Sequence, residues 1–173
     1  MNPRLPLGVY TGFPENIHYF IEYQVFSSTR QLQQKLLKFL GEINRKEMVF
    51  EQISIPTIPG GVVIFEYGLA EDAGFNYLSE EEVKRALGLV ENGRVGRLDF
   101  FCSIRYYKDT GDKRVALKFD YYMLRAVFRK GEVEVRVFHE RGPRYLSPED
   151  LVGFIVDNLN RESQKTILRE INA

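Results

Sequence analysis

The chain has 173 residues, of which 44% are hydrophobic and 28% charged, and its 24 Lys and Arg balance its 24 Asp and Glu. Such a composition excludes an intrinsically disordered chain and indicates one soluble globular domain. No apolar run approaches the ~20 residues that span a bilayer, and residues 1–12 lack the apolar core of a signal peptide. We therefore expect a cytoplasmic protein with no membrane partner.

Residues 1–16 are rich in Pro and Gly, which resist regular structure, and are predicted to form an arm that lies across the domain. Apolar and polar residues alternate over 17–26, which is the pattern of a first strand. Ser28 and Gln31 then form a capping-box pattern, which predicts a helix that ends near Arg45.

The next two runs, 48–55 and 62–69, are rich in residues that favour strands and are separated by a turn that contains Pro and Gly. They are predicted to form two antiparallel strands. Ser79 and Glu82 repeat the capping-box pattern, and the apolar spacing that follows predicts a second helix that ends at Gly93.

Three more strands are predicted in the most basic part of the chain. The first covers 97–107 and is followed by a loop of Asp and Gly residues, which favour turns. The second covers 114–129, and its alternation slips near Tyr121–Met123, which indicates a bulge. The third covers 133–137 and should have one face in water.

The last elements are helical in pattern. Ser147 as N-cap and Pro148 at the first helical position predict a third helix. The apolar residues within 167–171 either continue that helix or form a short second one.

The order of these elements matches the ferredoxin-like arrangement, in which strands one and three are neighbours at the centre and both helices cover one face. We therefore predict a single α+β domain over residues 1–173. It comprises the arm (1–16), a ferredoxin-like βαββαβ core (17–108), and an extension of two antiparallel strands, a β-hairpin, with a C-terminal helix (109–173).

Positive charge is concentrated in the later strands, because residues 94–145 hold 13 Lys and Arg against 7 Asp and Glu. The same stretch is rich in Tyr and Phe. Cations supply affinity for phosphates and rings supply stacking for exposed bases, so the region indicates binding of RNA or single-stranded DNA. The pattern is also typical of ordinary solvated strand faces. The residues predicted to bind nucleic acid are Arg105, Tyr107, Lys113, Arg114, Arg129 and Arg136.

In the predicted fold, the sheet face away from the helices is too apolar to remain bare, since a large exposed apolar patch usually marks an interface. Three coverings are open: the last two strands, the final helix, or a second copy of the chain, which would make a homo-oligomer. Each would remove Glu22, Glu66 and Arg105 from water together, and a shielded carboxylate needs a cation. The three side chains form either a satisfied polar cluster or the acid–base site of a small enzyme that acts on an anionic metabolite.

Signatures of known catalytic and cofactor sites are absent from the sequence. There is no phosphate-binding glycine loop, no dinucleotide-binding signature, no HExxH and no cysteine pair, so neither a cofactor nor a metal site is expected. Segment Gly61–Tyr67 resembles the third-strand signature of the RRM family of RNA-binding domains, but presents Val62 and Ile64 where that family presents stacking rings, so its function is not carried over. The sequence favours a non-catalytic binding or assembly module, with the small enzyme as the alternative.

Overall fold

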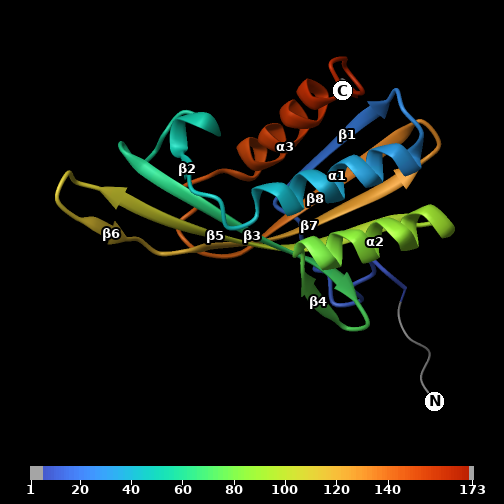
Figure 1. Cartoon of the computed structure of the whole chain (residues 1–173), viewed down its shortest axis with the longest axis horizontal. Coiled ribbons are helices and arrows are strands. Elements are labelled where there is room, and N and C mark those ends of the chain that lie inside the picture. The colour runs from blue at the N-terminus through green and yellow to red at the C-terminus, as the bar shows by residue number, and fades with distance from the viewer. Residues whose placement is uncertain (1–5, 172–173) are drawn as a thin grey trace.

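The computed structural model describes residues 6–171, which form one sheet of nine strands with three α-helices packed on one face (Figure 1). The α+β class is confirmed. In chain order, the elements are β1 (Tyr19–Val25), α1 (Thr29–Ile43), β2 (Met48–Val49), the 3-10 helix η1 (Phe50–Gln52), β3 (Gly61–Glu71), β4 (Gly74–Tyr77), α2 (Glu80–Asn92), β5 (Arg97–Asp109), β6 (Arg114–Ala116), β7 (Asp120–Arg129), β8 (Glu132–Arg141), α3 (Pro148–Glu162) and β9 (Leu168–Glu170).

The strands lie in the order β2-β3-β5-β7-β8-β1-β9, with β4 beside β3 and β6 beside β5. The ferredoxin-like order is not confirmed. That order needs β1 between β3 and β5, but β3 and β5 pair directly along Gly61–Leu69 and Phe100–Lys108. Strands β5, β7 and β8 follow one another as antiparallel neighbours, and this meander leaves β1 to pair with β8 and β9.

The three α-helices begin at the predicted N-caps, where each cap serine accepts a hydrogen bond from the backbone N–H three residues on: Ser28, Ser79 and Ser147. At α1 the capping box is complete, because the Gln31 side chain accepts from the Ser28 N–H in return. At α2 the Glu82 carboxylate instead accepts from Arg85, at 3.1 Å.

Two segments depart from the prediction. Only Met48–Val49 of the predicted second strand pairs with β3, because the chain then turns into η1 and buries Phe50. The tail forms strand β9 rather than a helix. The Asn160 side-chain oxygen accepts hydrogen bonds from the N–H groups of Ile167 and Leu168, both at 2.9 Å, and this turn directs the tail onto β1.

The long strand predicted after the 108–113 loop is divided into β6 and β7. Between Ala116 and Asp120 the chain advances four residues while the paired β5 advances three, so one extra residue is accommodated at Leu117–Phe119. A register shift also lies between Tyr121 and Tyr122 in the ladder with β8. The slip in alternation therefore corresponds to real irregularities, centred slightly earlier than predicted.

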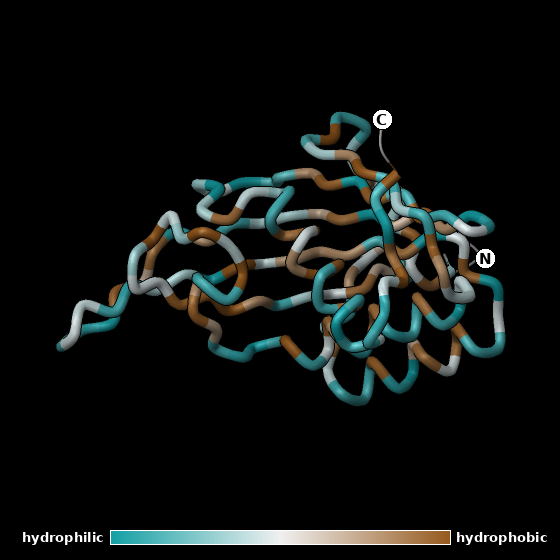
Figure 2. The backbone as a smooth tube through the Cα atoms, turned by 90° about the horizontal axis from the view of Figure 1, so that it is seen from above, coloured by the Kyte–Doolittle hydropathy of each residue, from teal (hydrophilic) through white to brown (hydrophobic). Residues whose placement is uncertain are grey.

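The sheet has two distinct faces. Helices α1, α2 and α3 cover the inner face, which supplies the buried apolar side chains Phe65, Tyr67, Phe100, Ile104, Tyr122 and Val137. The alternate residues of each strand lie on the opposite, outer face, and Figure 2 shows hydrophobic and hydrophilic positions succeeding one another along the strands.

The arm, not the last strands or the final helix, lies on part of the outer face. Gly8 donates to Ala70 O and accepts from Asp99 N, both at 2.7 Å, and at the other end of the arm His18 N donates to Val137 O. Strands β6 to β8 extend the sheet, and α3 packs on its inner face. Within residues 6–171, no helix has both the length and the apolar character that crossing a membrane requires.

Candidate functional site

A row of aromatic rings crosses the outer face. Phe75 of β4, Phe101 of β5 and Tyr121 of β7 follow one another with centroids 5.7 and 6.0 Å apart, and Phe119 lies 5.9 Å beyond Tyr121. All four rings are half-buried. Gly68 makes room for this ring row, because it pairs with Phe101 and a Cβ placed on it would lie 3.2 Å from Phe75 Cβ.

The ring row ends in a hollow of about 630 Å³, lined by Lys118, Phe119, Tyr121, Arg141, Gly142 and Pro143. The Arg141 guanidinium lies 4.4 Å from the centre of the Tyr121 ring. Lys118 and Arg141 are exposed, and neither forms an ion pair in the part of the chain that the structure describes. The hollow therefore combines two rings with two cations whose charge is not neutralised by a neighbour.

A buried carboxylate holds the wall of the hollow in place. Asp120 is fully buried and accepts hydrogen bonds from the backbone N–H groups of Arg144 and Tyr145, at 2.7 and 3.0 Å. The Tyr106 hydroxyl donates to it at 2.6 Å, and His139 Nε2 lies at 2.9 Å. Burial, reinforced by the Asp120 charge, raises the pKa of Tyr106, so this hydroxyl remains a donor.

The loop after β8 approaches the hollow very closely. Gly142 has φ of +119°, and a Cβ at this position would lie 2.3 Å from Phe119 O and 2.5 Å from Asp120 Oδ1. Only glycine fits both this conformation and this space. The Asp120 bonds and Gly142 together set the distance between the two sides of the hollow.

The residues predicted to bind nucleic acid fall into two separate groups. Arg105, Tyr107, Lys113 and Arg114 lie at the β5–β6 end, where Arg114 stacks on Tyr107 at 5.6 Å but also pairs with Glu47 and Asp109.

Arg129 and Arg136 lie at the far end of the sheet and share one acidic partner. Arg136 Nε donates to the buried Glu134 at 2.7 Å, and Arg129 lies 3.7 Å from the same carboxylate. The two groups are not brought together, and most of their charge is compensated within the chain.

The predicted polar cluster assembles only in part. Arg105 donates to Glu66 at 2.6 Å, and Arg45, which lies over the Tyr77 ring, is 3.9 Å from the same carboxylate. Glu22 does not join them. It lies on β1 opposite Glu134, and strands β7 and β8 separate it from β5. Of the three side chains, Glu66 and Arg105 therefore meet, and Glu22 lies apart from them.

A second buried carboxylate fastens the arm. Asp99 is fully buried and accepts from Arg125 Nε at 2.8 Å and from Tyr10 N at 2.9 Å, while Phe13 lies over the Arg125 guanidinium. These charges have a structural role. Across residues 6–171, no three His, Cys, Asp or Glu side chains are grouped so that they could hold a metal ion.

Comparison with known proteins found no matching family model, no matching curated protein and no matching solved structure. The site is therefore interpreted from its own geometry.

Sequence reasoning missed Lys118, Phe119, Tyr121 and Arg141 as site residues. The signal that could have found them is the hairpin register around the Lys130–Gly131 turn, which places the end of β8 beside the start of β7. A regular register would place Glu140 opposite Tyr121, and the shift after Tyr122 brings Arg141 there instead.

Proposed function

We propose that the protein is a non-catalytic binding module that holds single-stranded nucleic acid on its outer face, with bases on the ring row and a phosphate at Lys118 and Arg141. The observation that carries the proposal is the position of two uncompensated cations at the end of a half-exposed ring row. Rings contribute stacking, and cations contribute attraction to the phosphate backbone.

The geometry suits unpaired bases rather than a duplex. Rings on the face of a sheet can stack only on bases that are splayed out of a helix. The hollow offers cations, rings and backbone, and among residues 6–171 no amide or carboxylate side chain lines it to read base edges or to transfer protons. We therefore expect binding with weak sequence preference and without chemical change to the ligand.

The test is fluorescence anisotropy with short labelled oligo-dT and oligo-U over a range of salt concentrations. Loss of the Tyr121 ring in Tyr121→Ala should weaken binding about 5- to 150-fold, because one stacked base contributes about 1–3 kcal/mol. Tyr121→Phe, which keeps the ring, should bind like the wild type. Arg141→Ala should also lower the slope of log K against log salt by about 0.7, which is the contribution of one phosphate on a single strand.

A matched pair at the opposite end of the molecule provides the control. Phe26 is exposed and lies under Arg169 at 5.4 Å, so it repeats the ring–cation arrangement of Tyr121 and Arg141 away from the ring row. Phe26→Ala and Arg169→Ala remove the same groups and the same charge, and should leave binding unchanged. Binding that is absent at low salt, or equally weak in both pairs of variants, would refute the proposal.

Self-association is the second candidate function. Exposed apolar side chains gather at the end of the sheet that carries β2 and β6, where Val49, Ile55 and Val115 are 50, 90 and 44% exposed. A second copy could cover them. A solution mass above that of one chain, reduced to one chain by Ile55→Ser with Val115→Ser, would support it, and a monomeric wild type would remove it.

A further inference from the structure

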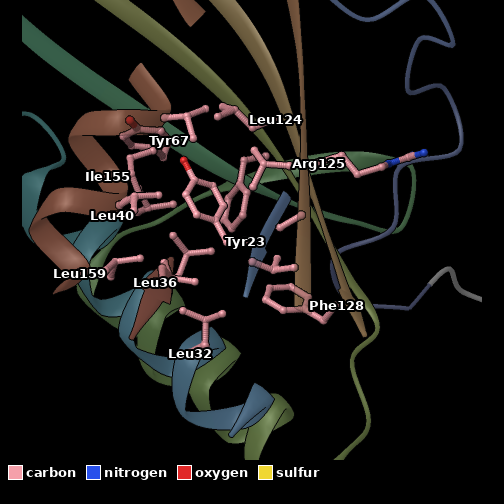
Figure 3. A pocket seen from close by; sticks show the side chains of 17 residues that line it. Tyr23, Leu32, Leu36, Leu40, Tyr67, Leu124, Arg125, Phe128, Ile155 and Leu159 are labelled. Carbon is pink, nitrogen blue, oxygen red and sulfur yellow. The ribbon is translucent and has the colours of Figure 1, made fainter. Parts of the chain in front are cut away.

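The two faces of the sheet differ in what they offer a ligand. The space between the inner face and helices α1 and α3 is lined by apolar side chains, including Leu36 and Phe128, and the Arg125 guanidinium points away from it (Figure 3). No polar atom of the described lining is exposed to this space. A ligand that is recognised by hydrogen bonds therefore finds no partner there, whereas the outer face carries polar side chains beside its rings.

Five side chains on the outer face are grouped around Ser103 of β5. Ser103 pairs with Glu66 of β3 on one side and with Tyr121 of β7 on the other. Phe101 precedes it by two residues and Arg105 follows it by two, so all five side chains lie on the same face. Two rings therefore flank Ser103 on two sides, and the Glu66–Arg105 ion pair flanks it on the other two.

The small side chain of Ser103 stands between these larger ones. It is half-buried, and its hydroxyl forms no hydrogen bond within residues 6–171. The Phe101 and Tyr121 rings are 6.0 Å apart and only half-buried, so each keeps part of its surface open to a flat ligand. A base stacked against them lies over Ser103, with its edge toward the ion pair.

The ion pair presents its hydrogen-bonding atoms in a defined order. Arg105 Nη2 donates to Glu66 Oε1 at 2.6 Å, and Glu66 Oε2 accepts no hydrogen bond within residues 6–171. The Glu66 side chain is 30% exposed and that of Arg105 is 29% exposed, so both can reach a ligand. A carboxylate only accepts and a guanidinium only donates. The pair therefore offers two neighbouring acceptors followed by a donor.

Among the common bases, guanine matches this order. Its Watson–Crick edge carries two neighbouring donors, N2–H and N1–H, followed by the acceptor O6. Adenine and cytosine have a ring acceptor beside their amino group, and uracil and thymine have a carbonyl on each side of their N–H. Each of these four bases would direct an acceptor at the carboxylate, which has no proton to donate. Single-stranded bases are free to be read on this edge.

We propose that the outer face holds a guanine base over Ser103, stacked against Phe101 and Tyr121. Its N1–H and N2–H donate to Glu66, and its O6 accepts from Arg105. The inference rests on the proposed function, because it takes single-stranded nucleic acid as the ligand, and it names the base that one position of the surface prefers.

The guanine site lies beside the hollow. Arg141 is the partner of Tyr121 on β8, so it is two strand spacings, about 10 Å, from Ser103. A phosphate at Arg141 and a base over Ser103 are therefore close neighbours along one strand. The hollow attracts the backbone, and the ion pair beside it reads the base.

The probes are labelled strands of oligo-dT in which one central thymine is replaced by guanine, adenine or hypoxanthine. In fluorescence anisotropy, the guanine strand should bind about 5- to 150-fold more tightly than the adenine strand, which is the equivalent of about 1–3 kcal/mol for one bidentate base contact. Hypoxanthine keeps N1–H and O6 but lacks the N2 amine, so its strand should bind more weakly than the guanine strand and more tightly than the adenine strand.

Variants test the position of the site. Glu66→Gln replaces one acceptor by a donor and should abolish the preference for guanine over adenine. Ser103→Leu should abolish it as well, by filling the space between the rings and the ion pair. Glu22→Gln is the matched control, because it makes the same change on β1, away from the ring row, and should keep the wild-type preference.

The outcomes separate this inference from the function on which it rests. If none of the strands binds, the proposed function itself is refuted. If all strands bind but guanine gains nothing over adenine or over hypoxanthine, or if the preference survives Glu66→Gln, the guanine assignment is overturned and the proposed function stands.

Discussion

The inner and outer faces of the sheet come from the same alternating strands, but they differ in which polar groups they contain and in the partners of those groups. On the outer face nearly every shielded charge has a partner, as in the pairs Asp99–Arg125 and Glu134–Arg136. Lys118 and Arg141, in contrast, are exposed and form no ion pair in the described chain. On the inner face the Tyr67 hydroxyl is buried beside Cys102, its partner residue on β5, and forms no hydrogen bond of ordinary geometry within residues 6–171. The candidate site on the outer face is therefore marked by exposed cations that have no acidic partner in residues 6–171.

The largest expected effect concerns the packing of the inner face. Phe65 is fully buried and stacks on Tyr67 and Phe154, so Phe65→Ala should lower the free energy of unfolding by about 3–5 kcal/mol. Phe101→Ala, on the half-buried outer face, should cost about 1–2 kcal/mol, because less area is removed from water. Urea denaturation of both variants measures the difference. Equal losses would mean that the outer face is as much a part of the core as the inner face.

Gly142, which lines the hollow, has no room for a side chain. Gly142→Ala should lower the free energy of unfolding by about 2–4 kcal/mol, because the new Cβ is strained in φ and also collides with Phe119 O. Gly131→Ala is the matched control, since Gly131 also has positive φ, +75°, but open space around it, and should cost about 1 kcal/mol. If the two variants lose the same stability, the close approach beside the hollow is not a tight contact.

How much of the fold and the site the sequence predicts depends on how far apart in the chain the interacting residues lie. The serine caps and the helices they begin are local, and the sequence predicts them. Alternation also predicts which residues share a face, but it does not say which strands are neighbours. The expected position of β1, between β3 and β5, came from the order of the elements alone and is not the observed one. Arg105 was expected beside Glu22 or Glu66 because a shielded carboxylate needs a cation, and it pairs with Glu66 because β3 and β5 are direct neighbours.

The remaining features depend on irregularities that composition does not encode. One extra residue in β8 decides that Arg141, not Glu140, lies opposite Tyr121. One side-chain amide, that of Asn160, decides that the tail becomes a strand.

A smaller difference in stability should distinguish Arg136, which pairs with a buried carboxylate, from Arg141 of the hollow. Arg136→Ala leaves the buried Glu134 without its 2.7 Å partner and should lower the free energy of unfolding by about 1–3 kcal/mol. Arg141→Ala removes an exposed cation that has no ion pair in residues 6–171, and should change stability by less than about 0.5 kcal/mol. Thermal and urea unfolding measure both. A large loss in Arg141→Ala would show that this arginine supports the fold rather than a ligand.

The smallest effect concerns the buried hydroxyl of Tyr67. Tyr67→Phe removes a buried oxygen that forms no hydrogen bond of ordinary geometry within residues 6–171, so the free energy of unfolding should stay the same or rise by up to about 1 kcal/mol. Tyr122→Phe removes a hydroxyl that donates to Leu146 O and leaves that buried carbonyl unsatisfied, which should cost about 1–2 kcal/mol. The two substitutions delete the same atom from the same face, so their difference measures the partner alone. If Tyr67→Phe loses as much stability as Tyr122→Phe, the Tyr67 hydroxyl already has a partner, and the neighbouring Cys102 side chain is the group in place to provide it.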